Sequence, residues 1–147
     1  MLIKDVLAAK SVSLLTLQAD RPLGEAAAAM AKAKIGSVVV VDVSGRPIGL
    51  ISEPDIVGAV SAEGAACLTR DVRLAMRVPV KCSPDDNVTR ALARMTRERI
   101  RYLLVVEADR FIGLVSIGDL VKARLDESEL ESRVLRDMAH GAMLARA

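Results

Sequence analysis

The apolar positions of the chain follow two patterns, one with helical spacing and one of short continuous apolar runs. Together they predict a protein that contains both helices and strands. Residues 1–10 and 23–34 repeat apolar side chains at helical spacing, and the second segment is rich in alanine. Residues 12–18 and 37–43 are rich in valine and leucine, which favours strands. The run at 37–43 alternates so little that both of its faces should be covered.

Turn residues and caps complete the first set of elements. Residues 44–47 are typical of a hairpin turn, and the apolar run at 48–51 should form the returning strand. We expect Asp20 to be the N-cap of the helix at 23–34, and Ser52 to open a helix that continues to about residue 62. A linker with one helical turn should follow at residues 65–77.

The same order of elements returns about 65 residues later. The second set comprises a strand at 78–81, a cap at 83–86, a helix at 88–99, strands at 102–107 and 111–115, and a long final helix from Ser116. Leu23 aligns with Val88, and Met30 aligns with Met95. Each unit is therefore β-α-β-β-α, and the fold class is α+β. A unit this small seldom buries enough surface alone, so the two copies should pack face to face and leave two related clefts.

We divide the chain into a first repeat with its leading helix (1–66), a second repeat with its linker (67–125) and a C-terminal helical tail (126–147). Leu130, Val134 and Met138 are spaced by four in the tail, which gives one narrow apolar edge. Such a helix either lies back on its own repeats or acts as an arm for a dimer or another partner.

Composition narrows the class of protein. The chain has 147 residues, and its 52% hydrophobic content comes from alanine and valine rather than from one long block. A membrane span needs about 20 apolar residues, and no run approaches that length. The net charge of +2 and the lack of tryptophan argue against nucleic-acid binding. Without a recognisable leader segment, we expect a cytoplasmic protein.

Metal and catalytic sites find no support in the sequence. Cys67, Cys82 and His140 are far apart, and a structural zinc site needs about four such ligands. We expect both cysteines to be buried small side chains rather than a disulfide. No serine has a histidine near it to act as a base, and no phosphate-loop sequence is present. We therefore predict no catalytic residues, no metal and no catalytic cofactor, and a protein that is not an enzyme.

One motif stands at the same place in both repeats, where a strand meets a helix. Ser52 and Asp55 form a Ser-x-x-Asp pair, and so do Ser116 and Asp119. Such a pair can simply cap the helix. The same geometry can also bind a ligand, because a helix N-terminus attracts phosphate and an aspartate can accept both hydroxyls of a ribose. A glycine and two apolar residues precede each serine, which capping alone does not require.

This repeated Gly-apolar-apolar-Ser-x-x-Asp motif after an apolar hairpin resembles a tandem pair of CBS repeats (a Bateman module). The resemblance covers about residues 10–125. It implies sheet-to-sheet packing with pseudo-two-fold symmetry and a homodimer. It also implies clefts for AMP or ATP, with NAD(H) or S-adenosylmethionine as further candidates. In the family the aspartate holds the ribose and the serine touches phosphate.

The resemblance also assigns residues around each motif. The hairpin that faces a ligand opens at Gly36 and Ser37 in the first copy and at Arg101 and Tyr102 in the second. Val80 and Leu15 should lie by the base, and Glu53 and Ile117 follow the two serines. The complete candidate ligand-binding set is Leu15, Gly36, Ser37, Ser52, Glu53, Asp55, Val80, Arg101, Tyr102, Ser116, Ile117 and Asp119.

The two copies differ at the hairpin positions, which predicts unequal sites. Arg101 stands where the first copy has Gly36, so only the second repeat offers a cation for phosphate. We expect one well-formed site that combines Ser52 and Asp55 with Arg101 and Tyr102. The other site, which combines Ser116 and Asp119 with Gly36 and Ser37, should be weaker or take a different ligand.

The sequence thus predicts a regulatory module that senses an adenine nucleotide and signals through its dimer or through a regulated partner protein. The alternative is an interaction module whose clefts stay empty and whose Ser-x-x-Asp pairs only cap helices.

Overall fold

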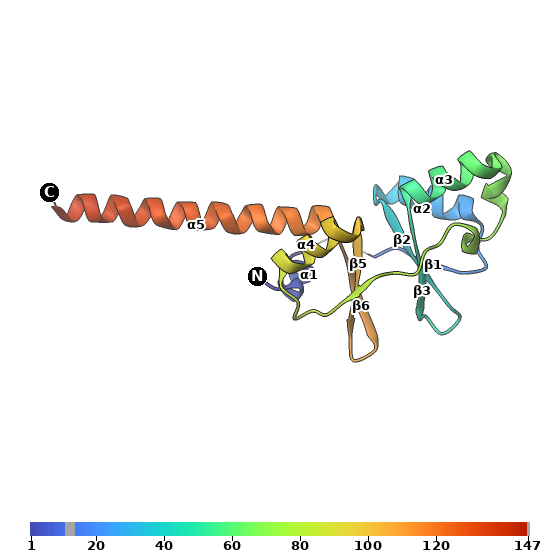
Figure 1. Cartoon of the computed structure of the whole chain (residues 1–147), viewed down its shortest axis with the longest axis horizontal. Helices are drawn as coiled ribbons and strands as arrows, with labels where there is room; N and C mark the ends of the chain where they lie inside the picture. Colours follow the sequence, from blue (N-terminus) through green and yellow to red (C-terminus); the bar gives the residue numbers. More distant parts are fainter. Residues whose placement is uncertain (11–13, 147) are drawn as a thin grey trace.

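Two three-stranded sheets lie side by side in the computed structural model of the chain, which describes residues 1–10 and 14–146 (Figure 1). The strands of the first sheet are β1 (Thr16–Gln18), β2 (Ser37–Val41) and β3 (Pro47–Ser52), and those of the second are β4 (Lys81–Cys82), β5 (Tyr102–Glu107) and β6 (Arg110–Ser116). In each sheet the first strand runs parallel to the second, and the second and third form an antiparallel hairpin.

The register of the two hairpins is the same. Ser37 lies opposite Ser52 in the first hairpin, and Tyr102 lies opposite Ser116 in the second. The pairing also shifts at equivalent points, between Val40 and Val41 and between Val105 and Val106. The sequence repeat is therefore a repeat of structure down to its irregularities.

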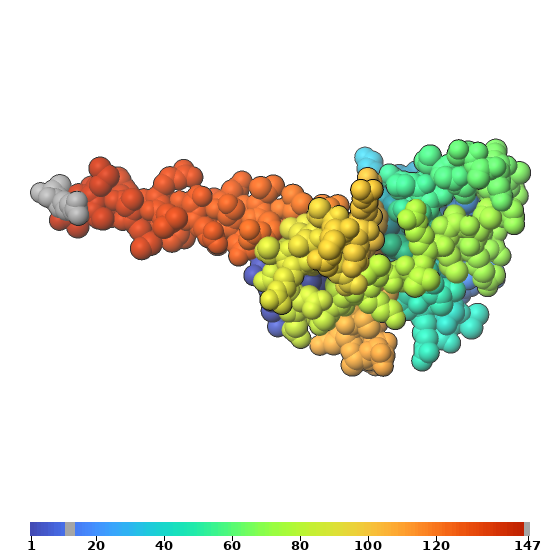
Figure 2. Space-filling view, viewed as in Figure 1, coloured from blue at the N-terminus to red at the C-terminus, as the bar shows by residue number. Residues whose placement is uncertain are grey.

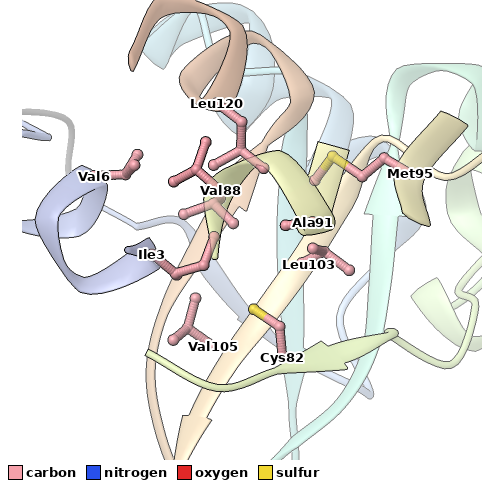
Figure 3. Packing of buried hydrophobic residues seen from close by; sticks show 10 residues of the cluster. Ile3, Val6, Cys82, Val88, Ala91, Met95, Leu103, Val105 and Leu120 are labelled. Carbon is pink, nitrogen blue, oxygen red and sulfur yellow. The ribbon is translucent and has the colours of Figure 1, made fainter. Parts of the chain in front are cut away.

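Helices cover the outer side of each sheet. They are α1 (Ile3–Ala9), α2 (Leu23–Ala33), α3 (Glu53–Glu63), α4 (Val88–Glu98) and α5 (Ile117–Arg146), with short 3₁₀ helices η1 (Ala65–Thr69) and η2 (Val72–Leu74) in the linker. Leu23, Ala26 and Met30 of α2 pack against Val38 and Val40 in the first core. In the second core, Val88, Ala91 and Met95 take the equivalent places, and Figure 3 shows them with Leu103 and Leu120.

The inner faces of the sheets meet in a third cluster. Val39, Leu104 and Leu114 are at most 6% exposed there, although each lies on the side of its strand away from the helices. The expectation that the strand at 37–43 has two covered faces is thus confirmed, as is sheet-to-sheet packing. A strand that is buried on both faces has no solvent-facing side, so its sequence does not alternate apolar with polar residues.

The segment that precedes each half packs on the other half. Ile3 and Val6 of α1 belong to the second core, where the Ile3 amide donates to the Asp86 carbonyl at 2.9 Å (Figure 3). The linker, which precedes the second half, packs in turn on the first half, where Cys67 and Val72 are buried in the core. The division at residue 66 places α1 with the first repeat and the linker with the second. In the structure each of these two segments packs on the other repeat.

Two strands are shorter than the sequence pattern predicts. Of the strand expected at 12–18, Thr16–Gln18 is a strand, and residues 11–13 lie outside the described residues. The strand expected at 78–81 is Lys81–Cys82, because Val78 is 85% exposed and Pro79 has no amide to donate. Pairing begins at Val80, whose carbonyl accepts the Leu104 amide at 2.8 Å.

Two predicted caps are wrong. Asp20 does not cap α2: Pro22 occupies the N-cap position, and the Leu23 amide donates to the Arg70 carbonyl of the linker at 2.8 Å. The cap of α4 is Asn87 rather than the preceding segment 83–86, and its Oδ1 accepts the Thr89 amide at 2.9 Å. In the first case a tertiary contact satisfies the amide that a side chain was expected to satisfy.

α5 leaves the body of the protein after its first turns (Figures 1 and 2). Leu120 is fully buried, whereas every side chain from Ser128 to Ala145 is exposed. Of the two alternatives for this helix, the one in which it lies back on its own repeats is therefore wrong. We call residues 126–146 the arm. Within the described residues, no helix combines the length and apolar content that crossing a bilayer requires.

Candidate functional site

A cavity of about 260 Å³ opens where the first half, the linker and the second half meet. We call it the first cleft, and its lining comprises Leu50, Ser52, Pro54, Asp55, Arg77, Val78, Pro79, Val80, Arg99, Ile100, Arg101 and Tyr102. Five residues of the predicted set are thus brought together: Ser52 and Asp55 from one half, and Val80, Arg101 and Tyr102 from the other.

Asp55 has donors on both of its carboxylate oxygens. Its Oδ2 accepts the Ser52 amide at 2.9 Å and the Ser52 hydroxyl at 2.8 Å. Its Oδ1 accepts Nε of Arg77. The Asp55 side chain is only 5% exposed. The carboxylate is therefore a fixed, buried acceptor at the mouth of α3.

Capping alone accounts for the local bond between serine and aspartate. Ser83 and Asp86 have the same spacing, and the Ser83 amide donates to Asp86 Oδ2 at 2.9 Å outside the first cleft. A Ser-x-x-Asp hydrogen bond is therefore no sign of a ligand in itself. What distinguishes Ser52 and Asp55 is that their helix begins at a cavity shared with the other half.

Arg77 is a residue of this site that the sequence did not indicate. Its backbone is fixed by two hydrogen bonds with Leu50, of 2.8 and 2.9 Å, while its side chain is 74% exposed. Asp55 lies 22 residues earlier in the chain, and no spacing rule connects the two. Only the path of the linker across β3 brings the guanidinium to the carboxylate.

Tyr102 reaches from the second half to the first. A Cβ atom on Gly36 would lie 2.9 Å from its hydroxyl oxygen, so the absence of a side chain at Gly36 makes room for the tyrosine. Burial raises the pKa of the Tyr102 hydroxyl, and a hydrogen bond with Ser37 offsets only part of that rise. Gly36 and Ser37 therefore contact Tyr102 of the other half.

Asp119 repeats the arrangement with a different cation. The Ser116 amide donates to its Oδ2 at 2.9 Å, and its own amide donates to Ser116 Oγ at 3.0 Å. Lys10 donates to the same carboxylate oxygen at 2.9 Å and to the Leu114 carbonyl at 2.9 Å. Burial alone would raise the pKa of Asp119, but the hydrogen bonds from Ser116 and Lys10 outweigh it and lower the pKa.

The remaining predicted residues are not gathered around Asp119. A cavity of about 230 Å³ adjoins it, lined by Met1, Asp5, Val6, Ala9, Lys10, Asp119, Lys122, Ala123 and Asp126. Leu15, Gly36 and Ser37 are absent from this lining. The Leu15 carbonyl instead accepts the Val39 amide at 2.9 Å, as Val80 does for Leu104 in the other half.

Glu53 and Ile117 have equivalent backbone roles in the two halves. The Glu53 amide donates to the Gly36 carbonyl at 3.1 Å, and the Ile117 amide donates to the Arg101 carbonyl at 2.8 Å. Each helix mouth is thereby tied to the start of the adjacent strand in its own sheet. Neither residue lines the first cleft.

The two cavities differ in charge. Three arginines, Arg77, Arg99 and Arg101, line the first cleft against the single carboxylate of Asp55. Around Asp119 the charged side chains comprise two lysines and three acids. Because its cationic side chains outnumber its single carboxylate, the first cleft attracts anions.

The glycines before each serine make room for protein atoms. A Cβ on Gly49 would lie 2.5 Å from Sδ of Met76, and one on Gly113 would lie 2.8 Å from a methyl carbon of Leu7. Met76 belongs to the linker that precedes the second half, and Leu7 belongs to α1, which precedes the first half. Each glycine therefore makes room for the leading segment of the other half. Among the described residues, His, Cys, Asp and Glu form no group that could hold a metal ion.

Comparison with known families identifies both halves. The sequence pattern of the CBS domain matches residues 3–62 and again residues 70–126. An uncharacterised 17.7 kDa protein of Acidianus ambivalens is 37% identical over 106 residues, which is 71% of this chain and 63% of that protein. The mitochondrial CBS domain-containing protein CBSX3 of Arabidopsis thaliana is 28% identical over 148 residues, 95% of this chain and 72% of its own length. The chain thus spans less than two thirds of the Acidianus protein.

Solved structures show the same fold. A CBS-domain-containing protein from Agrobacterium tumefaciens is 40% identical with a TM-score of 0.79, covering 84% of this chain and 92% of its own. A CBS domain protein from Pyrobaculum aerophilum, complexed with AMP, is 25% identical with a TM-score of 0.76, covering 90% and 99%. The CBS domain pair of protein MJ0100, in complex with 5′-methylthioadenosine and S-adenosyl-L-methionine, is 24% identical with a TM-score of 0.73, covering 88% and 98%, and supports the fold alone.

Proposed function

The chain belongs to the CBS-domain family, and from that premise we propose that it is a regulatory module that binds an adenosine nucleotide in the first cleft. The observation that carries the proposal is the composition of that cleft. A buried carboxylate at a helix mouth of one half faces an arginine and a tyrosine of the other half across about 260 Å³. The related protein complexed with AMP supports an adenosine compound as the ligand class.

Each part of a nucleotide has a partner of suitable chemistry in the cleft. Asp55 can accept the two ribose hydroxyls, and the N-terminus of α3 with Ser52 can donate to phosphate. Arg101 can add a charge-assisted hydrogen bond from the other half. Val80 and Tyr102 offer apolar surface to the base.

Such a ligand would contact both halves at once, which gives the binding a regulatory consequence. A ligand shifts a conformational equilibrium only through its different affinity for the two states. Contacts from both halves favour the arrangement in which the cleft is more closed. We propose that the arm, which begins at the second half, transmits this change, and that the role is regulatory rather than catalytic.

Thermal unfolding tests the proposal directly. The full chain is melted alone and with AMP, ATP, NADH or S-adenosylmethionine at millimolar concentration. A ligand at about 100 times its dissociation constant adds about 2.7 kcal/mol of stability and raises the melting temperature by several degrees. The proposal expects such a shift with AMP or ATP.

Three asparagine variants show whether the shift arises in the first cleft. Asp55→Asn should abolish it, because a neutral amide is a weaker acceptor for the ribose. Asp86→Asn is the matched control, since it loses the same charge at the same spacing from a serine outside the cleft. Asp119→Asn should leave the shift largely intact, because we propose one strong site. Equal losses in all three variants, or no shift with any ligand, would contradict the proposal.

One observation favours a second candidate, an interaction module with empty clefts. Ser52 and Asp55 form a capping pair, as Ser116 and Asp119 do, and this accounts for the motif without a ligand. The arm would then carry the function. Absence of any ligand shift in the melting experiment, together with self-association of the full chain, would favour this candidate.

We further propose that a second copy of the chain covers the arm. Residues 126–131 contain four acids and no base, while residues 133–140 contain Arg133, Arg136 and His140 with the single acid Asp137. An antiparallel pair of arms sets the acidic half of one against the basic half of the other, whereas a parallel pair sets like charges together. The stripe of Leu130, Val134 and Met138 gives the apolar surface that each copy would contribute to the contact.

A further inference from the structure

We propose that Arg77 is a specificity-determining residue, which makes the first cleft select adenosine compounds of net negative charge over neutral or cationic ones. The inference rests on the proposed function, since it concerns the same cleft. It goes further by naming the charge class of the ligand and a residue, outside both Ser-x-x-Asp motifs, that sets it.

The argument begins with the two oxygens of Asp55. Oδ2 accepts two hydrogen bonds from Ser52, and Oδ1 accepts Nε of Arg77. A carboxylate has about four acceptor positions, and these three donors leave one of them open. A ribose that uses both of its hydroxyls here must therefore displace one donor, and the exposed guanidinium at Oδ1 is the one with room to leave. The exchange keeps the buried carboxylate supplied with donors, which matters because an unpaired buried charge is costly.

The displaced guanidinium has room to move. The Arg77 backbone is fixed by its two hydrogen bonds with Leu50, but the side chain is 74% exposed and can rotate while the main chain stays in place. The first cleft is small, at about 260 Å³ against roughly 300–1,000 Å³ for most ligand sites. Withdrawal of the side chain from Asp55 enlarges it.

After the exchange, Arg77 lacks the anion that it had. Arg99 and Arg101 line the same cavity, so three cationic side chains then surround the ligand. A phosphate group supplies the missing anion and gives Arg77 a charge-assisted partner. Adenosine supplies none, and S-adenosylmethionine brings a sulfonium and an ammonium besides its single carboxylate, so its net charge is positive. The arginine thus couples occupation of the ribose position to the presence of an anionic tail.

The equivalent cation in the other half shows a different arrangement. Lys10 is only 25% exposed on its side chain and donates to two acceptors, Asp119 and the Leu114 carbonyl. Two lysines and three acids line the adjoining cavity, so its side chains have no excess of positive charge to attract a phosphate. We therefore assign the selection for an anionic ligand to the first cleft, and within it to Arg77.

Titration calorimetry on the full chain tests the inference with three probes: AMP, adenosine and S-adenosylmethionine. The native protein should bind AMP at least tenfold more tightly than either of the other two. In Arg77→Gln, AMP should weaken by about tenfold or more, the scale of one lost hydrogen bond to a charged group. Adenosine should bind as well as before or better, because nothing then competes for Asp55.

Arg73→Gln is the matched control. Arg73 lies in the same linker, is exposed and pairs with an aspartate, Asp71, but it does not line the first cleft. Its AMP-to-adenosine ratio should equal that of the native protein. Arg77→Lys keeps the charge and should retain most of the preference, which separates charge from hydrogen-bond geometry.

The outcomes distinguish the two proposals. If AMP and adenosine bind and Arg77→Gln leaves their ratio unchanged, the inference is overturned while the proposed function stands. If neither binds the native protein, both fail. A melting curve of Arg77→Gln without ligand confirms that it folds, and Arg77→Lys gives a second, milder test of the same ratio.

Discussion

Each of the two repeated aspartates meets a cation that comes from a different part of the chain. Asp55 is held by Arg77, 22 residues later, and Asp119 by Lys10, 109 residues earlier. The two carboxylates are equivalent in sequence and in local hydrogen bonding, yet their cations differ in type and exposure. This difference is the residue-level reason to expect two unequal sites.

Asp119 should contribute to stability in a way that depends on pH. Its pKa is lower in the folded state than its ordinary value of about 3.9, so its charged form favours folding. That contribution is complete above the ordinary pKa and is lost as the pH falls through the lowered one. In urea unfolding from pH 7 down to pH 3, Asp119→Asn should therefore lose less stability than the native protein.

Asp126→Asn is the control for this titration, because Asp126 lines the same cavity but takes no part in the hydrogen bonds that join Asp119 to Ser116 and Lys10. Its stability should fall with pH as that of the native protein does. An acid profile of Asp119→Asn that coincides with the native one would show that the hydrogen bonds around Asp119 do not act as described.

At the residue scale, the sequence located the acids but not their partners. The Ser-x-x-Asp spacing is local, and a spacing of three is what a helix mouth brings together. Arg77 and Lys10 have no such signal, because their approach depends on how the linker and the N-terminal segment cross the hairpins. The meeting of Tyr102 with Gly36 likewise required the packing of one half on the other.

At the scale of elements, the interiors of the helices and strands could be predicted from the sequence, whereas several of their ends could not. The hairpins and the helices α2, α3 and α4 lie within a few residues of their predicted ranges. The errors fall where a tertiary contact replaces a local one, as at Leu23, whose amide donates to the linker. The predicted start of β4 is also wrong, since Pro79 has no amide hydrogen to donate to a neighbouring strand.

Replacement of the α4 cap should destabilise the protein measurably. Asn87→Ala removes the acceptor of the Thr89 and Arg90 amides and should cost about 1 kcal/mol, or about 2–4 °C in melting temperature. Asn87→Ser keeps a capping oxygen and should be close to native. If Asn87→Ala is neutral while Asp86→Ala is costly, the cap lies in the preceding segment, as the sequence pattern had indicated.

At the scale of the whole molecule, the halves are tied together twice. Their sheets share a buried cluster, and each half also receives the segment that precedes the other. This double connection explains why glycine stands at positions 49 and 113, where Met76 and Leu7 pass close to a strand. A change at the first cleft therefore has a physical route to the second half, where α5 begins.

The arm leads to a prediction about assembly. Helices in proteins gain most of their stability from tertiary packing, and the arm, with its exposed apolar residues, lacks such packing on its own chain. If a second copy covers it, light scattering should give the full chain the mass of a dimer. Val134→Glu places a charge from each copy in the apolar stripe of the contact and should shift the mass towards a monomer.

Val43→Glu is the matched control, since Val43 is 95% exposed in the turn between β2 and β3, in the half that does not carry the arm. It should leave the mass unchanged. A monomeric native chain, or a dimer that Val134→Glu leaves intact, would show that something other than a second arm covers this helix.

The sequence by itself determined the repeated order of elements, the two apolar cores and the position of the acids at the helix mouths. These follow from local rules, since hydrophobic period, turn chemistry and capping act over a few residues. Only the tertiary structure decided which half each leading segment packs on, which cation meets which aspartate, and that α5 projects as an arm. Those features depend on contacts between distant segments, which no local pattern encodes.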